Sequence, residues 1–168
     1  MNQSLEQVRT AITEALARSG TRAVGSFLPE KAAEYSTPVV AVGFRAGESR
    51  QAALGSYLGQ KIDPATLLPV ELYGVQLDLT LSLDIYSPIS AGAAGCEAIT
   101  PKLHQVMLEG LPSGLKALQL NWEEIVWDDS INMFMRRGSL ACTAYFIAAA
   151  EEDSTLLTDF ILKGVVTK

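Results

Sequence analysis

The stretch "VQLDLTLSLDIY", residues 75–86, decides the fold of this chain. Apolar and polar residues alternate along it, so that a valine, four leucines and an isoleucine share one side. Side chains of a β-strand point alternately to its two faces, and the alternation therefore predicts a strand with one buried and one solvated face. Such regular alternation favours an antiparallel sheet covered on one side over a parallel sheet buried on both.

The region before this strand predicts a helix and a shorter strand. Apolar residues recur at helical spacing near the N-terminus, where Ser4 and Gln7 have the form of a capping box and Gly20 is a natural stop. The valine-rich stretch "PVVAVGF", residues 38–44, predicts a short strand. Residues 46–74 have weak patterns and are long for a loop, so we expect them to be either partly structured or a projecting contact loop.

The region after the strand predicts a second helix and then a hairpin. The turn "SPISAG" leads into a helix over residues 96–107, in which Pro101 either introduces a kink or starts the main part with Thr100 as its cap. Alternating residues follow on both sides of a "DDSIN" turn, and their parity changes at Glu123–Glu124, which predicts a β-bulge. The residues expected to point inward are Leu118, Leu120, Trp122, Ile125 and Trp127, then Leu140, Cys142, Ala144, Phe146 and Ala148.

The end of the chain and its overall length complete the predicted architecture. The segment "TDFILKGVV", residues 158–166, resembles a last strand, although a short helix over 154–158 is also open. At 168 residues the chain is long enough for one domain with its own core. We therefore predict a single α+β domain over residues 1–168, a mainly antiparallel sheet with helices packed on one face.

Composition excludes several classes of partner. Apolar residues make up 48% of the chain and charged residues only 19%, a balance that favours a protein that hides surface against other subunits. The 13 basic residues form no stripe, and 19 acidic ones outnumber them, so we expect no specific nucleic-acid binding. No apolar run is long enough for a membrane span and no signal peptide is visible, which predicts a cytoplasmic protein.

Residues that could carry chemistry are few. The only histidine, His104, is expected at the surface or boundary of the second helix, and Cys96 and Cys142 are expected to be buried free thiols. A zinc site needs three or four such ligands at suitable spacing, and no nucleophile elbow or phosphate-binding loop is present. We therefore expect no catalytic, metal-binding or cofactor-binding residue, and no enzyme.

The stretch "WDDSINMFMRRG", residues 127–138, has two interpretations. Asp128 and Asp129 could pair with Arg136 and Arg137 across the hairpin turn, as cross-strand ion pairs. Alternatively, these four residues and Phe134 contact a neighbouring subunit, since arginine and bulky apolar residues are favoured in interfaces. Four bulky apolar residues at a hairpin tip suit contact with a partner better than contact with solvent, and here they are Ile131, Met133, Phe134 and Met135.

The order of these segments resembles the tail-terminator, or tail-completion, proteins of tailed bacteriophages and phage-tail-like particles. An N-terminal amphipathic helix is followed by a strand ending in "LDIYSP" and a helix, "CEAITPKLHQVMLEGLP". The hairpin "LQLNWEEIVWDDSINMFMRRGSLACTAYF" and "FILKGVV" come next. The resemblance covers most of the chain in layout through loose motifs, and residues 46–74 depart from the family by being longer and richer in glycine.

The resemblance implies a non-enzymatic structural protein with a small mixed sheet and flanking helices. Members form a ring, commonly a hexamer, on the last ring of the tail tube, where they stop growth and offer a surface for head joining or closure. The implied partners are copies of this chain and tail tube subunits, with sheath subunits and head-tail connector proteins as further candidates. Such a protein assembles in the bacterial host cytoplasm and then becomes part of the particle. The alternatives are another tube, neck or baseplate component, or a small-molecule-binding α+β domain.

Overall fold

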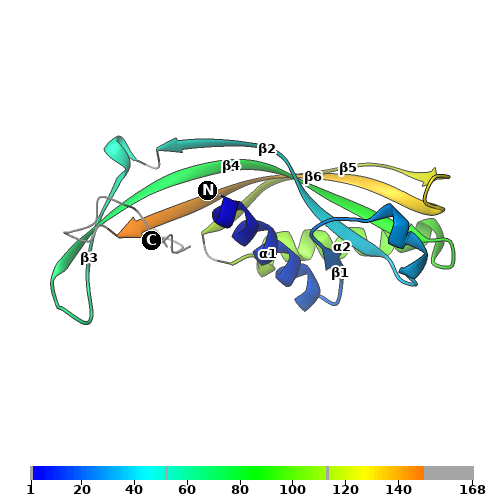
Figure 1. Cartoon of the computed structure of the whole chain (residues 1–168), viewed down its shortest axis with the longest axis horizontal. Coiled ribbons are helices and arrows are strands. Elements are labelled where there is room, and N and C mark those ends of the chain that lie inside the picture. Colours follow the sequence, from blue (N-terminus) through cyan, green and yellow to red (C-terminus); the bar gives the residue numbers. More distant parts are fainter. Residues whose placement is uncertain (1, 52, 113, 150–168) are drawn as a thin grey trace.

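The computed structural model describes residues 2–51, 53–112 and 114–149. Figure 1 shows a long, gently twisted sheet with two helices beneath one of its faces. The predicted strand over 158–166, the alternative helix over 154–158 and the side chain of Ala148 lie outside the described residues. The elements in chain order are α1 (Asn2–Arg18), β1 (Arg22–Val24), η1 (Pro29–Glu34), β2 (Val39–Gln51), η2 (Leu54–Ser56), β3 (Tyr57–Ile62), β4 (Pro69–Pro88), α2 (Gly92–Gln105), η3 (Val106–Gly110), β5 (Leu115–Asp128) and β6 (Met133–Ala149).

The sheet is mixed but mainly antiparallel. Its order is β1-β2-β4-β6-β5, and β3 pairs with the start of β4, next to the end of β2. Only the β1–β2 pairing is parallel among the pairings of the described residues. The described residues thus form an α+β domain with a mainly antiparallel sheet, as the sequence predicts.

Strand β4 is the central strand of the sheet, and its residues alternate in polarity. Leu79, Leu81, Leu83 and Ile85 are buried beneath the helices, and the polar residues between them are only half-buried on the opposite face. The strand pairs with β2 on one side and β6 on the other. The predicted strand over 75–86 is confirmed, and it extends further at both ends than the alternation shows.

Residues 46–74 are mostly strand and not a loop. The second half of β2, β3 and the start of β4 occupy most of this segment, which we call the arm. In Figure 1, β3 and the start of β4 extend beyond the helices, together with the end of β6. Many arm residues are exposed or half-buried, so no continuous buried face imposes an alternating pattern on this part of the sequence.

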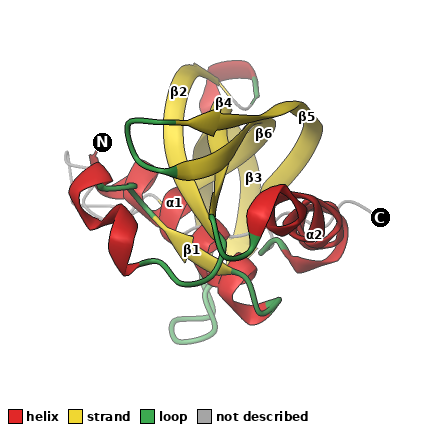
Figure 2. Cartoon of the chain, turned by 90° about the vertical axis from the view of Figure 1, so that its right-hand side faces the viewer, coloured by secondary structure: helices red, strands yellow, loops and turns green. Residues whose placement is uncertain are grey.

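Helices α1 and α2 cover one face of the sheet, as the end view in Figure 2 shows. Their apolar stripes are continuous with the inward residues of β4 and β6 in one core. The helical residues that contribute most to it are Val8, Ile12, Leu16, Cys96, Ile99 and Leu103.

The ends of the helices differ from the sequence prediction in two places. Helix α1 begins at Asn2, so the position of Ser4 lies within its first turn, whereas Gly20 follows the helix with a left-handed φ of 76° as expected. Pro101 lies inside α2, and the Thr100 hydroxyl donates to the Cys96 carbonyl oxygen at 3.0 Å. Thr100 is therefore a mid-helix residue, and α2 begins at Gly92.

Strand β5 contains the predicted bulge and a second one. The register shifts between Trp122 and Ile125, as the change of parity at Glu123–Glu124 predicts. Another shift, between Ala117 and Gln119, leaves Leu118 as an extra residue that is 59% exposed. The prediction that Leu118 points into the core is therefore wrong.

A second, smaller apolar cluster lies on the opposite face of the sheet, near the end of β4. Val39 belongs to this cluster, whereas its neighbour Val40 belongs to the main core, because adjacent strand residues point to opposite faces. Phe27 stacks on Tyr86 with ring centroids 3.9 Å apart. At this end of the sheet, the second cluster thus covers the face opposite the one that α1 and α2 cover.

Candidate functional site

The turn between β5 and β6 places the predicted acids and arginines apart from one another. The register pairs Asp128 with Met133 and Arg136 with Ile125, so the arginines lie several residues beyond the turn. Within the described part of the chain, neither Asp128 nor Asp129 forms an ion pair with Arg136 or Arg137. The predicted cross-strand ion pairs are therefore wrong.

The two aspartates hold the turn itself. Asp128 accepts hydrogen bonds from the backbone N–H of Ser130 at 2.9 Å and from its hydroxyl at 2.6 Å. These bonds favour the charged carboxylate and lower the pKa of Asp128. Asp129 accepts a hydrogen bond from the indole N–H of Trp127. Both carboxylates have a local structural role, and a role in subunit contact stays a prediction.

The two arginines point to opposite faces of β6. Arg136 faces α2, where its Nη1 donates to the Thr100 hydroxyl at 3.0 Å and its buried Nε has no hydrogen-bond partner. Arg137 is exposed on the other face, close enough to Asp84 and Asp128 to favour their charged forms. They do not form one basic cluster, and a role in subunit contact stays a prediction for both.

The apolar residues of the same turn are mostly internal. Met133 and Met135 are buried, and Ile131 packs against the second apolar cluster. Phe134 is half-buried and meets Trp127 edge-to-face at 5.0 Å. Met133 and Met135 are therefore core residues and not the exposed contact residues that the sequence suggests, whereas a contact role for Phe134 stays a prediction.

The open polar face of the sheet carries two aspartates in different environments. Asp78 accepts hydrogen bonds from Gln76 and Thr143, both at 2.9 Å, and pairs with Arg50 at 3.0 Å, which together lower its pKa. Burial raises the pKa of Asp84, although it pairs with Arg45 at 3.3 Å.

A perturbed carboxyl can mark a catalytic site, but ion-pair networks perturb pKa values as well. Asp84 also accepts a hydrogen bond from the Gly138 N–H at 3.3 Å, so its interactions are those of a structural network. In the described ranges, no group of three or more His, Cys, Asp or Glu could hold a metal ion. His104 is exposed and meets Trp122 edge-to-face at 5.0 Å, and Cys96 and Cys142 are buried free thiols, as the sequence predicts.

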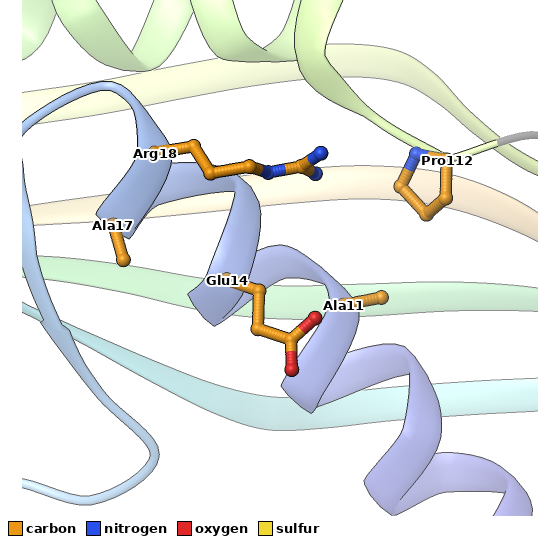
Figure 3. Close-up of a pocket in the computed structure, with 5 residues that line it drawn as sticks. All are labelled: Ala11, Glu14, Ala17, Arg18 and Pro112. Atoms are coloured by element: carbon orange, nitrogen blue, oxygen red, sulfur yellow. The ribbon is translucent and has the colours of Figure 1, made fainter.

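A pocket of about 550 Å³ opens between α1 and the segment before β5 (Figure 3). Its lining is mainly apolar, with Glu14 and Arg18 as the charged members. Both side chains are exposed, and Arg18 donates to the Gly110 carbonyl oxygen at 3.4 Å. A small-molecule site is usually enclosed and has buried convergent polar groups, so this open pocket is better suited to a protein side chain.

The end of the arm presents three apolar side chains that no periodic pattern in the sequence marks. Ile62, Leu67 and Leu68 lie at the β3–β4 turn and are 61%, 75% and 63% exposed. A cluster of exposed aliphatic residues at the end of a projection is typical of a contact element. The signal in the sequence is "IDPATLLP", a turn-forming Asp-Pro followed by two leucines that belong to no periodic pattern.

No protein-family model matches the chain, and no curated protein matches it with significance. None of the helices in the described residues is both long and apolar enough to cross a membrane.

Proposed function

We propose that this protein is a structural assembly subunit that forms a ring, a hexamer in the simplest case, at the end of a phage or phage-like tail tube. The ring stops tube growth and offers a surface for head joining or for closure of a headless particle. It assembles in the cytoplasm of a bacterial host. This proposal rests first on the likeness in layout to tail-terminator proteins.

The observation that carries the proposal furthest is the arm. Three large aliphatic side chains at its end are more than half exposed, and such a cluster is costly to leave in water unless a partner covers it. A ring subunit must contact identical neighbours through surfaces that differ from each other, so a projecting element on one side is expected of it.

The interactions of the aspartate carboxylates support the same proposal. The Asp84 and Asp78 carboxylates hold sheet residues and nearby arginines, and the Asp128 and Asp129 carboxylates hold a turn. These groups stabilise the fold, which accounts for their presence without a reaction. The binding partners expected for the ring are tube subunits, then sheath or head-tail connector subunits.

The test is the mass of the purified chain, measured by native mass spectrometry at two concentrations and followed by electron microscopy. A discrete closed ring that blocks further addition of tube subunits is the expected result. Open-ended polymers made by this chain alone would instead favour a tube component. A chain that stays monomeric with tube ends present would contradict the proposal.

A further inference from the structure

We infer that the tip of the arm, residues 61–68, inserts into the pocket between α1 and Pro112 on a neighbouring copy of this chain. The inference rests on the proposed function, for which it names the contact between subunits. The inserted side chains are Ile62, Leu67 and Leu68, and the receiving surface is the one drawn in Figure 3.

The tip is held in shape before any partner arrives. The Asp63 carboxylate accepts from the Ala65 N–H at 2.9 Å and the Thr66 hydroxyl at 3.0 Å, and the N–H of Leu67 donates to the Asp63 carbonyl oxygen at 2.8 Å. The N–H of Asp63 in turn donates to the Leu68 carbonyl oxygen at 2.9 Å. A preformed turn loses little conformational entropy on binding, which makes its exposed leucines more effective contact residues.

The pocket has a floor that suits aliphatic side chains. Ala11, Ala17 and Pro112 form its apolar lining, and their small side chains allow a neighbour to approach the α1 backbone closely. The pocket, of about 550 Å³, is open to solvent, so a side chain of a neighbour can reach it. Filling it with the tip would remove apolar surface of both partners from water.

The charges at the two surfaces are complementary. The rim of the pocket carries Glu14 and Arg18, and the tip carries Lys61 and Asp63. None of these four belongs to an ion pair within the described part of the chain. A basic and an acidic side chain on each partner can therefore pair crosswise, which favours this chain itself as the occupant over a partner of uniform charge.

The position of the tip means that the contact forms between two copies of the chain and not within one. The tip lies beyond the N-terminal end of α1 in Figure 1, at the end of paired strands that hold it away from the pocket of its own chain. Because tip and pocket are different surfaces, the contact runs head to tail, and it closes into a ring when the rotation per subunit allows.

The first test traps the contact with a designed disulfide. A Leu67→Cys, Ala17→Cys double variant is oxidised and run on a non-reducing gel. The native Cys96 and Cys142 are buried, so they add little background. We expect products that rise stepwise from the dimer to the size of the ring, whereas a mixture of the two single variants should stop at the dimer.

A matched control distinguishes this contact from nonspecific association through exposed leucines. Leu118 is also an exposed leucine but lies on β5, away from the tip, so a Leu118→Cys, Ala17→Cys variant should give no ladder. In parallel, replacing both Leu67 and Leu68 with serine should raise the concentration at which rings dissociate by at least about tenfold. Leu118→Ser should leave that concentration unchanged.

The presence or absence of the ladder and of the ring decides the inference. A ladder, together with weaker association of the serine variant, supports it. A wild-type ring without a ladder overturns the inference and leaves the proposed function standing. Serine substitutions that abolish binding to tube subunits but not the ring would assign the tip to a different protein and also overturn it. Absence of both ring and ladder, with tube ends present, would overturn the inference and the proposed function together.

Discussion

Replacing Leu83 with alanine should lower the free energy of unfolding by about 3–5 kcal/mol, whereas the same change at Leu118 should alter it by less than about 0.5 kcal/mol. Leu83 is fully buried on the central strand beneath both helices, and Leu118 is 59% exposed on the edge strand. Leucine to alanine removes the equivalent of about three methylene groups, worth roughly 2.4 kcal/mol in transfer alone, and the cavity left at a buried site adds to this. An exposed side chain leaves no cavity.

The measurement is urea unfolding followed by circular dichroism and by the fluorescence of the two tryptophans. All variants must be compared at one protein concentration, because self-association adds stability by mass action. A loss at Leu118 as large as that at Leu83 would show that the register of β5 is wrong and that Leu118 is a core residue. A loss below about 1 kcal/mol at Leu83 would contradict its place in the core.

Three further predictions follow from the same structure. Gly138→Ala should destabilise the fold by about 1–3 kcal/mol in thermal or urea unfolding, because its Cβ would lie 2.6 Å from the Leu83 backbone oxygen. Burial raises the pKa of Asp84 above the usual 3.8, so the folded chain binds this proton more tightly than the unfolded chain. Wild type should therefore gain stability over Asp84→Asn as the pH falls from 7 through the folded pKa, and urea midpoints should show the gain levelling off below 3.8. Burial raises the pKa of Cys96 to about 11 and of Cys142 to about 12, so neither should react with a thiol reagent at pH 8 until denaturant is added, and early reaction would contradict their burial.

Periodicity in the sequence predicts those parts of the fold in which one face is buried. The strand over 75–86, the helix through Cys96 and Leu103, and the bulge at Glu123–Glu124 all follow from regular contact with the core. The alternation fails at Leu118 because a bulge adds a residue without any marker in composition. Glycine, proline and charge do not distinguish this position from its neighbours.

The candidate contact residues were harder to predict for a related reason. Adjacent arginines suggest a cluster, but Arg136 and Arg137 occupy successive positions on a strand and so face opposite ways. The sequence left open whether the arm is partly structured or a projecting loop, and it is built of strands. Strand β3 pairs with the nearby start of β4, but the second half of β2 pairs with later residues of β4, and the start of β4 pairs with the end of β6. A local pattern cannot report pairing partners that lie far away in sequence.

The uninterrupted length of β4 has a mechanical consequence. The strand runs for 20 residues from the arm to the turn before α2, about 65 Å at roughly 3.3 Å per residue. Its pairing with β6 extends from Leu72 to Pro88, so a pull on the arm along the strand loads many inter-strand hydrogen bonds at once, in shear. We therefore expect a force applied to the tip of the arm to be transmitted along β4 directly to the core, because the strand is continuous between the two.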